Sequence, residues 1–391
     1  MRMAIVGGGP AGALAAGRLA AAGRSVILFH HQPWPEKPCG GGIPSRGLEM
    51  SPELLDARLP RRIVSRLLLV SPSGRRAEIE LDAPVHVFSR ARLDRFLRER
   101  AVEAGATLIS ARVCRIERGA GTGRESFRLT DGTGREWVVG YVAGADGASS
   151  LVRRHFIGSH PPRALSQALG WYIDGARDDR MIVRFEHGLA GYQWCFPRED
   201  HLAIGICAPL GRLSARDLKE RCRRFARWLG HPVTAARPYA ALIPGFARDG
   251  DGRVVIEGAG WALLGDAAGA VDPLTREGLH HALETARLWT GSVLDPAGGT
   301  YTARFEAFFS AELQRAARQA ERFFAPAFTE RLVRYADASP AIRRVLSDLV
   351  AGRQPYATLR RRLLRCAVPL MVSMAVHRVT GGRSISRRQA A

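Results

Sequence analysis

The first thirty residues predict a strand, a helix and a second strand in close succession. Residues 3–6 and 25–29 are short apolar runs of the kind that form buried strands. Residues 11–22, between them, are rich in alanine and predict a helix. The next segment, residues 30–47, is rich in proline and glycine and predicts irregular structure. The chain therefore begins with a compact strand–helix–strand unit.

The rest of the chain predicts a sheet region and then a helical region. Further helices are predicted from apolar spacing at residues 89–104, 214–229 and 277–293, with helical sequence again from Tyr301 to the end. Strands are predicted at residues 108–109, 112–117, 126–130 and 137–142, and a strand with its turn at 261–269. Residues 164–243 alternate strands with turns, which suits an antiparallel sheet with one helix against it.

Glycines follow the first predicted strand at the spacing of a dinucleotide-binding loop. Gly7, Gly9 and Gly12 form a G-x-G-x-x-G motif that includes Pro10 and Ala11 and opens the first helix. Such glycines allow a tight turn and a close approach of pyrophosphate to the main chain. The helix N-terminus then faces the phosphate charge. The strand–turn–helix context predicts a dinucleotide site here.

The residue expected to contact the adenosine ribose is unusual. An Asp or Glu after the second strand commonly accepts hydrogen bonds from the ribose, but this chain has His30, followed by His31. A neutral imidazole can accept one hydrogen bond. We therefore predict that His30 contacts the ribose and that the cofactor is held more weakly than by a carboxylate.

Positive charge is the outlier of the composition. At 391 residues the chain is long enough for two domains, and its formal net charge is +21. Lys37 and Lys219 are the only lysines, so the charge is almost all arginine spread along the chain. A coding bias explains this as well as a binding surface does. Charge alone is the only argument for nucleic acid, and we predict no nucleic-acid partner.

The cysteines and the N-terminus suggest a reducing cytoplasm. None of the six cysteines forms a C-x-x-C pair, so neither a metal site nor a disulfide framework is predicted. The first strand begins by Met3, which leaves no room for a secretion signal. The C-terminal apolar run 366–376 is too short to span a bilayer and contains Pro369.

Arginines on both sides of that run leave two interpretations open. The flanking cations are Arg360, Arg361, Arg362 and Arg365 before the run, and Arg378, Arg383, Arg387 and Arg388 after it. Such a segment can dock in the interface of an anionic membrane. Alternatively, it packs on the body of the protein as a closing helix. The first interpretation adds peripheral contact at the inner face of the membrane to a cytoplasmic location.

Two later motifs specify the dinucleotide. Residues 144–153 (Gly-Ala-Asp-Gly-Ala-Ser-Ser-Leu-Val-Arg) and 264–269 (Leu-Gly-Asp-Ala-Ala-Gly) resemble the later flavin fingerprints of the p-hydroxybenzoate hydroxylase superfamily. The resemblance implies that FAD is the cofactor and that Asp266 holds its ribityl chain. The segment Arg92-Leu93-Asp94 matches the superfamily helix in which an arginine approaches the cofactor, although a solvated helix face is the alternative for Arg92.

Two further motifs resemble one branch of this superfamily, the geranylgeranyl reductases. Residues 37–44 (Lys-Pro-Cys-Gly-Gly-Gly-Ile-Pro) are similar to the loop that lies beside the flavin there. Tyr192-x-Trp194-x-Phe196-Pro197 matches the motif that lines their substrate cavity. Alternate residues of a strand project to one face, so the three rings form an aromatic wall and Cys195 faces the opposite core. The resemblance continues at 71–75, 272–275 and 359–361, and is nearest the chlorophyll and bacteriochlorophyll type.

Two positions depart from the family pattern. The pattern after the aromatic motif ends in G-x-G, whereas this chain has Gly205-Ile206-Cys207. Relatives usually have Gly before Glu-Gly, whereas this chain has Arg276 before Glu277 and Gly278. Both departures concern the substrate more than the fold.

The resemblance implies an α/β fold with three regions. These are a Rossmann-type, p-hydroxybenzoate hydroxylase-like FAD-binding domain (residues 1–70, 89–160 and 250–295), an antiparallel-sheet substrate domain (71–88 and 161–249) and a helical C-terminal region (296–391). The implied cofactor contacts are Gly7, Gly9, Pro10, Ala11, Gly12, His30, Cys39, Gly40, Gly41, Arg92, Asp146, Gly265, Asp266, Gly278 and Leu279. The implied catalytic residues are Cys39, Tyr192 and Trp194, with Cys39 beside the flavin and a proton source.

The activity that the resemblance implies is reduction of isolated C=C bonds in a prenyl chain. Reduced FAD supplies the hydride, and the protein supplies position and a dry cavity. NAD(P)H or another reductant would reduce the flavin. A flavin monooxygenase, either a hydroxylase or a halogenase, is the nearest alternative, although halogenases carry W-x-W-x-I-P where this chain has Tyr192, Trp194 and Phe196. A flavin electron carrier at a membrane surface is the alternative of another class.

Overall fold

The computed structural model describes residues 1–31, 36–56, 58–119 and 126–367. One part of the molecule, which draws on segments from both halves of the chain, is built on a six-stranded sheet with the order β16-β17-β10-β1-β2-β6. Strand β1 pairs in parallel with β2 on one side and with β10 on the other. The strands are β1 (Met3–Val6), β2 (Val26–Phe29), β6 (Thr107–Ile109), β10 (Tyr141–Gly144), β16 (Glu257–Gly258) and β17 (Trp261–Leu263).

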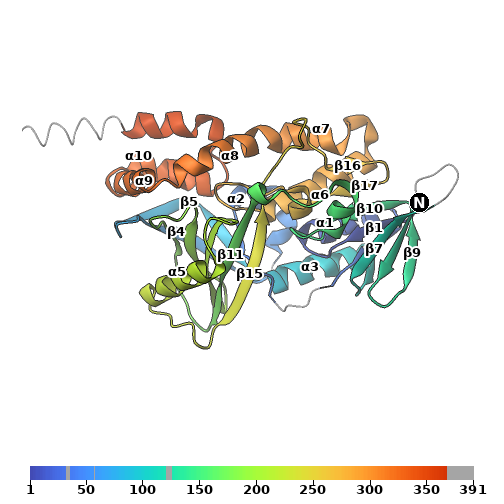
Figure 1. Ribbon diagram of the computed structural model, residues 1–391, viewed down its shortest axis with the longest axis horizontal. Coiled ribbons are helices and arrows are strands. Elements are labelled where there is room, and N and C mark those ends of the chain that lie inside the picture. The colour runs from blue at the N-terminus through green and yellow to red at the C-terminus, as the bar shows by residue number, and fades with distance from the viewer. Residues whose placement is uncertain (32–35, 57, 120–125, 368–391) are drawn as a thin grey trace, which may run out of the picture.

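Helices bury the central strands of this sheet, in which every residue of β1 and β2 is buried. Helix α1 (Pro10–Ala21) packs against α3 (Arg90–Glu103) and α6 (Leu279–Leu294). Small side chains on α1 let the neighbouring backbones come close. At Gly17, for example, an added Cβ would lie only 3.3 Å from the Ala101 Cα of α3. The predicted strand–helix–strand unit and the Rossmann-type fold are thus confirmed (Figure 1).

A small antiparallel sheet stands at one end of this part. It contains β7 (Val113–Arg118), β8 (Phe127–Asp131) and β9 (Glu136–Val139). Residues 137–142, predicted as one strand, belong to two strands in different sheets. The chain changes sheet at Gly140, whose N–H bonds to the Arg2 carbonyl and so directs β10 alongside β1.

The other part of the molecule is built on an eight-stranded sheet with the order β15-β11-β14-β13-β12-β4-β5-β3. Neighbouring strands are antiparallel, as predicted, except that β12 and β4 are parallel. The strands are β3 (Gly42–Ile43), β4 (Arg61–Val70), β5 (Arg76–Phe88), β11 (Leu165–Asp174), β12 (Met181–Arg184), β13 (Tyr192–Pro197), β14 (His201–Pro209) and β15 (Arg237–Pro244). Strand β4, which the sequence analysis places in the FAD-binding domain, pairs with β5 and β12, and β3 also joins this sheet through β5.

Helices cover both faces of the eight-stranded sheet (Figure 1). Helix α5 (Ala215–Trp228) packs on β11 and β14 through buried side chains that include Phe225. Helices α9 (Pro326–Ala338) and α10 (Pro340–Val350) pack on β5. Cys195 lies in the core on the α5 side. Tyr192 and Phe196 pack toward the α9 and α10 side, so the sheet separates them from Cys195 as predicted.

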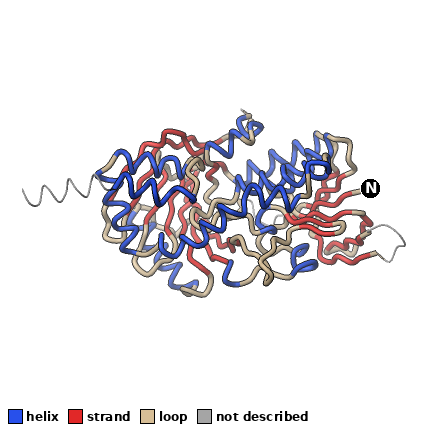
Figure 2. The backbone as a smooth tube through the Cα atoms, turned by 90° about the horizontal axis from the view of Figure 1, so that it is seen from above, coloured by secondary structure: helices blue, strands red, loops and turns tan. Residues whose placement is uncertain are grey.

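The remaining elements are mostly helical, which confirms the predicted C-terminal region. Helices α7 (Tyr301–Phe305) and α8 (Ala311–Phe323), joined by the short π-helix η5 (Glu306–Ser310), precede α9 and α10. Residues 356–367 are helical as far as they are described. Together they form a layer along one side of the molecule (Figures 1 and 2). The shorter elements are α2 (Ser45–Glu49), α4 (Leu151–Ile157), η1 (Pro52–Leu55), η2 (Pro162–Ala164), η3 (Gly265–Ala268) and η4 (Pro296–Gly298).

Most of the C-terminal segment considered for membrane contact lies outside the described residues. Only Cys366 and Ala367 of the apolar run fall within them, and the four arginines after the run do not. Among the residues that the structure describes, no helix is both long enough and apolar enough to cross a membrane.

Candidate active site

One cavity of about 650 Å³ lies where the two sheets and the C-terminal helices meet. We call it the central cavity. At one end it is lined by the glycine loop before α1 and by the turn before α6. At the other end it is lined by apolar side chains of the eight-stranded sheet and of the C-terminal helices, including Leu67, Met181, Phe324, Leu332 and Leu346. A polar end and an apolar end therefore share one space.

The glycine loop opens the main chain toward the central cavity. Gly9, Pro10 and Ala11 line it, at the N-terminus of α1. A Cβ at Gly12 would overlap the Gly7 carbonyl, and Gly7 itself has the left-handed φ of +110° that favours glycine. A Cβ at Gly9 would meet no atom within 4 Å. Protein atoms therefore surround Gly7 and Gly12 closely, whereas Gly9 faces open space. This arrangement fits a pyrophosphate held against the helix N-terminus.

His30 lies beside this loop in a neutral state. A Cβ at Gly8 would lie 2.9 Å from the His30 ring, so the imidazole packs directly on the glycine loop. Burial lowers the pKa of His30 to about 4, and the nearby Arg98 cation acts in the same direction. Arg98 also donates a hydrogen bond to the Gly8 carbonyl at 3.1 Å. At neutral pH the imidazole can therefore accept one hydrogen bond but brings no negative charge.

Replacing His30 by glutamate is expected to tighten FAD binding. A carboxylate accepts hydrogen bonds at two oxygens, and one additional net bond of about 1 kcal/mol would lower the dissociation constant roughly fivefold. Titration of the apoprotein with FAD, followed by flavin fluorescence, measures this constant. His31→Glu makes the same charge change at the exposed neighbouring residue. Equal constants for wild type and His30→Glu would contradict the assignment of His30 to the ribose.

The second flavin fingerprint lies at the same end of the central cavity. Gly265, Asp266, Gly278 and Leu279 all line it. Asp266 stands in the turn η3, whose backbone is fixed by the hydrogen bond between the His160 ring and the Asp266 carbonyl (2.9 Å). Gly278 is the N-cap of α6, so a second helix N-terminus faces the cavity. These residues fit the ribityl chain and the ring of FAD.

Gly7 and Gly12 within the glycine loop and His30 beside it do not line the central cavity, and two other predicted cofactor residues bind elsewhere. The Asp146 carboxylate accepts hydrogen bonds from the backbone N–H of Leu151 (2.7 Å) and from the Ser150 hydroxyl, so it caps helix α4. Arg92 is 43% exposed and pairs with Glu199 and Asp200. Neither side chain lines the central cavity. Arg92 thus lies on a solvated helix face, which was the alternative interpretation of this residue. Asp146 stabilises the fingerprint turn by capping helix α4.

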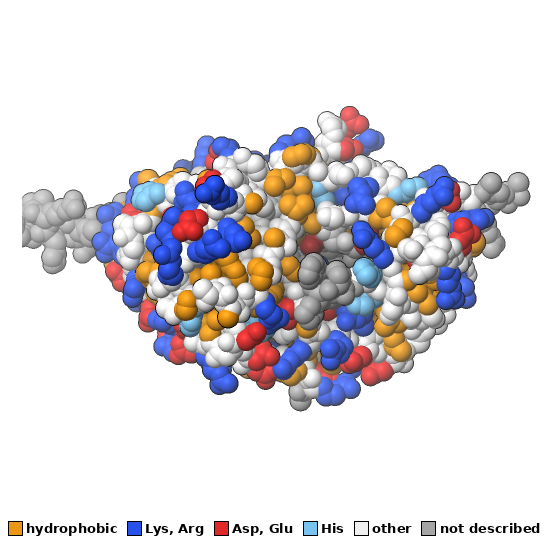
Figure 3. Space-filling model, turned by 60° about the horizontal axis from the view of Figure 1, so that its bottom comes forward, with side chains coloured by type: hydrophobic (Ala, Val, Ile, Leu, Met, Phe, Trp, Pro, Cys, Tyr) orange, Lys and Arg blue, Asp and Glu red, His pale blue; other side chains and the backbone are white. Residues whose placement is uncertain are grey.

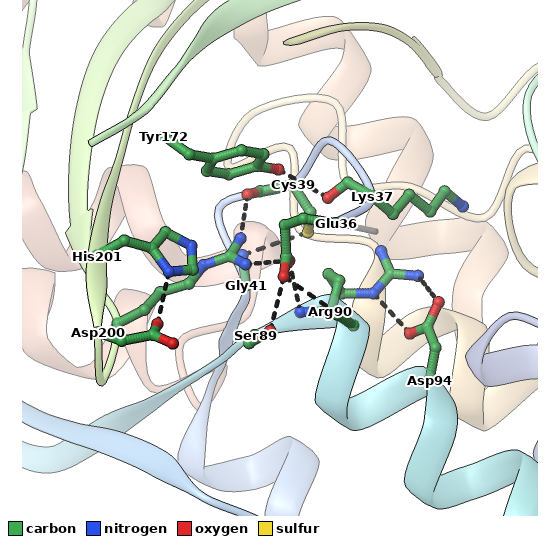
Figure 4. Close-up of polar contacts among 12 residues, drawn as sticks. Glu36, Lys37, Cys39, Gly41, Ser89, Arg90, Asp94, Tyr172, Asp200 and His201 are labelled. Carbon is green, nitrogen blue, oxygen red and sulfur yellow. Dashed lines mark hydrogen bonds and ion pairs between the residues drawn. The ribbon is translucent and has the colours of Figure 1, made fainter. Parts of the chain in front are cut away.

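The loop that carries Cys39 is held by a buried ion pair (Figure 4). Glu36 accepts hydrogen bonds from the Ser89 hydroxyl (2.6 Å) and from the Arg90 N–H (2.7 Å), and it pairs with Arg198. Arg198 in turn donates to the Cys39 carbonyl at 2.6 Å. Both members of the pair are almost fully buried, which makes the loss of either one costly. The pair therefore ties the loop to the turn after strand β13 and to the start of α3.

Cys39, Gly40 and Gly41 line the central cavity, as does Arg90. The Gly41 N–H donates a hydrogen bond to the Cys39 sulfur at 3.3 Å. The Arg90 guanidinium is held by Asp94 in a buried bidentate pair of 2.8 and 2.9 Å. The sequence motif located the loop, but it did not identify Glu36, Arg198 or Arg90. Glu36 and Arg198 are far apart along the chain, and no local pattern joins them.

The predicted aromatic wall faces the central cavity. Tyr192, Trp194 and Phe196 on β13 all line it. The Tyr192 hydroxyl donates to the Thr275 carbonyl and so ties the wall to the turn before α6. The Trp194 ring N–H is buried and has no hydrogen-bond partner among the described residues. The wall is therefore close to the flavin fingerprint and mostly apolar.

Glu277 is a cavity residue that the sequence analysis did not single out. Its side chain is 15% exposed, lines the central cavity and accepts a hydrogen bond from the His280 N–H at 2.7 Å. Burial raises its pKa to about 8, against the opposing effect of the backbone N–H groups of Leu279, His280 and His281. The carboxyl group is therefore mostly protonated at neutral pH. The sequence feature that could have identified Glu277 is its place next to Gly278, a predicted flavin contact.

Charge on the surface is mixed. Figure 3 shows Lys and Arg side chains interspersed with Asp and Glu over one face of the molecule, with hydrophobic side chains gathered near its centre. On the face shown, the positive charge does not form a continuous stripe. The excess of arginine is thus distributed there, as it is along the sequence.

Known proteins share this architecture. A sequence model of the FAD binding domain family matches residues 1–161. A geranylgeranyl diphosphate reductase of Rhodobacter capsulatus is 34% identical over 286 residues, covering 71% of this chain and 71% of that protein. A menaquinone reductase of Mycobacterium tuberculosis is 32% identical over 318 residues, covering 73% of this chain and 74% of that protein. A geranylgeranyl bacteriochlorophyll reductase-like structure from Thermoplasma acidophilum superposes with a TM-score of 0.74 at 20% identity, covering 93% of this chain and 98% of that one.

The fold and the matched domain define an FAD-dependent oxidoreductase with a p-hydroxybenzoate hydroxylase-like architecture. Relatives at least 30% identical match over more than two thirds of their own length. The chain therefore belongs to the geranylgeranyl reductase family. The predicted fold class, the family and FAD as the cofactor are confirmed.

Proposed function

We propose that this enzyme saturates isolated C=C bonds of a prenyl chain. The observation that carries the proposal is the central cavity, in which the FAD-binding turns and an apolar lining enclose one space. A prenyl chain is a flexible hydrocarbon, and burial of its surface against apolar side chains stabilises it in such a cavity. The names of the relatives, a geranylgeranyl diphosphate reductase and a menaquinone reductase, support an isoprenoid substrate.

The protein's own contribution is position, dryness and a proton. Bound in its reduced form, FAD supplies the hydride to one carbon of the double bond. Tyr192, Trp194 and Phe196 orient the chain and exclude water from it. Glu277 holds a proton at the same end of the cavity, and we assign to it the proton that the second carbon needs. Cys39 was the predicted source, but its sulfur accepts the Gly41 hydrogen bond, and we assign it to the structure of the loop.

Anaerobic turnover tests the proposed function. FAD-loaded protein is reduced with dithionite and incubated with geranylgeranyl diphosphate, and the products are analysed by mass spectrometry. Reduction adds two hydrogen atoms for each saturated bond. An unaltered substrate after complete flavin reduction would overturn the proposal. A product that appears only with oxygen and contains an added oxygen atom would identify a monooxygenase instead, and flavin turnover with no altered substrate would identify an electron carrier.

The reductant and the location belong to the same proposal. NAD(P)H, or another small reductant, would reduce the flavin, since the family chemistry consumes one hydride for each bond. A prenyl substrate dissolved in a membrane gives the protein a reason to dock there from the cytoplasm. Sedimentation with anionic liposomes, with and without the residues after Leu359, measures that contact. The contact should fall as salt increases.

Trp194→Ala is expected to impair use of the prenyl substrate without loss of FAD. Trp194 is 6% exposed and forms part of the wall, and loss of matched apolar contact in a pocket costs about 1–3 kcal/mol. The Michaelis constant should rise about tenfold or more. Steady-state kinetics and the flavin absorbance spectrum measure both quantities. Cys195→Ala changes the same strand on the opposite face and serves as the control; loss of FAD from Trp194→Ala alone would place the wall at the cofactor instead.

A further inference from the structure

Arg276 has a backbone conformation that normally favours glycine. Its φ is +60°, and it is the only residue other than glycine with a positive φ among those that the structure describes. A long side chain in the left-handed region is strained, and such strain persists only where the surrounding structure fixes it. The arginine therefore requires a reason beyond chain folding.

The turn around Arg276 is fixed from several directions. The Arg276 N–H donates to the Asp272 carbonyl at 3.0 Å. The Asp272 carboxylate accepts hydrogen bonds from the N–H groups of Leu274 and Thr275, each at 2.8 Å, and from the Tyr356 hydroxyl at 2.8 Å. These bonds hold the turn in place and determine where the Arg276 side chain projects.

The Arg276 side chain lines the central cavity as an unpaired cation. Its Nε is buried and has no hydrogen-bond partner among the described residues. The adjacent acidic residues do not pair with it, since the Asp272 carboxylate binds the turn and Glu277 is mostly protonated and binds the N-terminus of α6. By contrast, the buried Arg90 and Arg198 pair with Asp94 and Glu36. A buried N–H group without a partner is costly, and an anionic ligand in the cavity would satisfy it.

The guanidinium is close to the aromatic wall. Burial raises the pKa of the Cys207 thiol, and the Arg276 cation opposes that rise. Burial also raises the pKa of Tyr192, again with Arg276 acting in the opposite direction. Both side chains belong to the cavity lining. Cys207 and Arg276 thus both lie near Tyr192 in the lining of the central cavity.

We propose that Arg276 is a specificity-determining residue that binds an oxyanion, phosphate or carboxylate, carried by the prenyl substrate. The inference rests on the proposed function for the hydrocarbon part of the substrate. A guanidinium presents its N–H groups in a planar fork that matches both kinds of oxyanion. A neutral alcohol head group carries no negative charge, so the Arg276 cation adds little to its binding. Arg276 therefore selects among substrates with the same chain and different head groups.

Binding measurements with the FAD-loaded enzyme test this role. Three ligands share one C20 chain and differ in the head: geranylgeranyl diphosphate, geranylgeranoic acid and geranylgeraniol. Quenching of tryptophan fluorescence gives the dissociation constant of each before reduction begins. Arg276→Gly, which suits the positive φ, and Arg276→Gln, which keeps the bulk, should both weaken anionic ligands by about 10- to 100-fold. Geranylgeraniol should change by less than about twofold in both.

The control is Arg227→Ala, which removes one positive charge from the exposed part of α5. Weakening of the diphosphate alone would identify phosphate as the recognised group, and weakening of both anions would identify oxyanions in general. Equal changes for all three ligands, a change in Arg276→Gly only, or no change would overturn the proposal. If wild-type enzyme binds the ligands with this head-group preference but reduces none of them, the proposed function fails and the role of Arg276 stands.

Discussion

Gly9→Ala is expected to weaken FAD binding by about 10- to 100-fold while leaving the fold intact. Gly9 has a φ of −77°, which any residue adopts, and a Cβ there would meet no protein atom within 4 Å. The new methyl group would instead project into the space where the main chain must approach the pyrophosphate. Overpacking of a fitted contact by one methyl group costs about 1–3 kcal/mol, which gives the expected range.

The measurement is an FAD titration of the apoprotein, accompanied by thermal unfolding without FAD. Gly250→Ala is the matched control, because a Cβ at Gly250 also meets nothing within 4 Å and this residue lies away from the central cavity. Both variants should unfold at the wild-type temperature. Gly9→Ala with wild-type affinity would show that the glycine loop does not approach the cofactor.

The cofactor half of the site could be predicted because its determinants are local. Gly7, Gly9 and Gly12 lie within one turn, and the geometry of that turn excludes side chains inside it whatever surrounds it. The same holds for the turn at Asp266 and for the alternation that places Tyr192 and Trp194 on one face of β13. Local sequence was sufficient to predict a site residue wherever the local backbone determines the direction of its side chain.

Tertiary pairing explains what could not be predicted. Strand β4 follows the irregular loop of the FAD-binding half, yet its hydrogen-bond partners are β5 and β12 of the other sheet. The Asp146 carboxylate accepts a hydrogen bond from the Leu151 N–H at 2.7 Å and therefore points toward the N-terminus of helix α4. Arg92 has two acidic neighbours that come from the turn after β13. For β4 and Arg92 the deciding partners lie outside the motif, whereas the partners of Asp146 lie within its motif and depend on the start of helix α4.

Glu277→Gln is expected to slow reduction of the double bond by about 100-fold or more, the usual range for loss of a positioned proton donor. Burial raises the pKa of Glu277 to about 8, so the carboxyl group carries its proton at neutral pH. An amide of the same shape has no acidic proton to give. Wild-type turnover should be constant below pH 8 and should fall as the pH rises through this value, because the protonated acid is then lost.

Stopped-flow mixing of pre-reduced, FAD-loaded enzyme with the prenyl substrate measures this step directly, without oxygen and over pH 6–9. The matched control is Glu284→Gln, on the helix α6 that follows Glu277, because burial also raises the pKa of Glu284 but its side chain does not line the central cavity. The control should keep the wild-type pH profile, whereas Glu277→Gln should lose both the rate and the decline above pH 8. If the decline persists in Glu277→Gln, another group supplies the proton, and Cys39 is the next to be replaced.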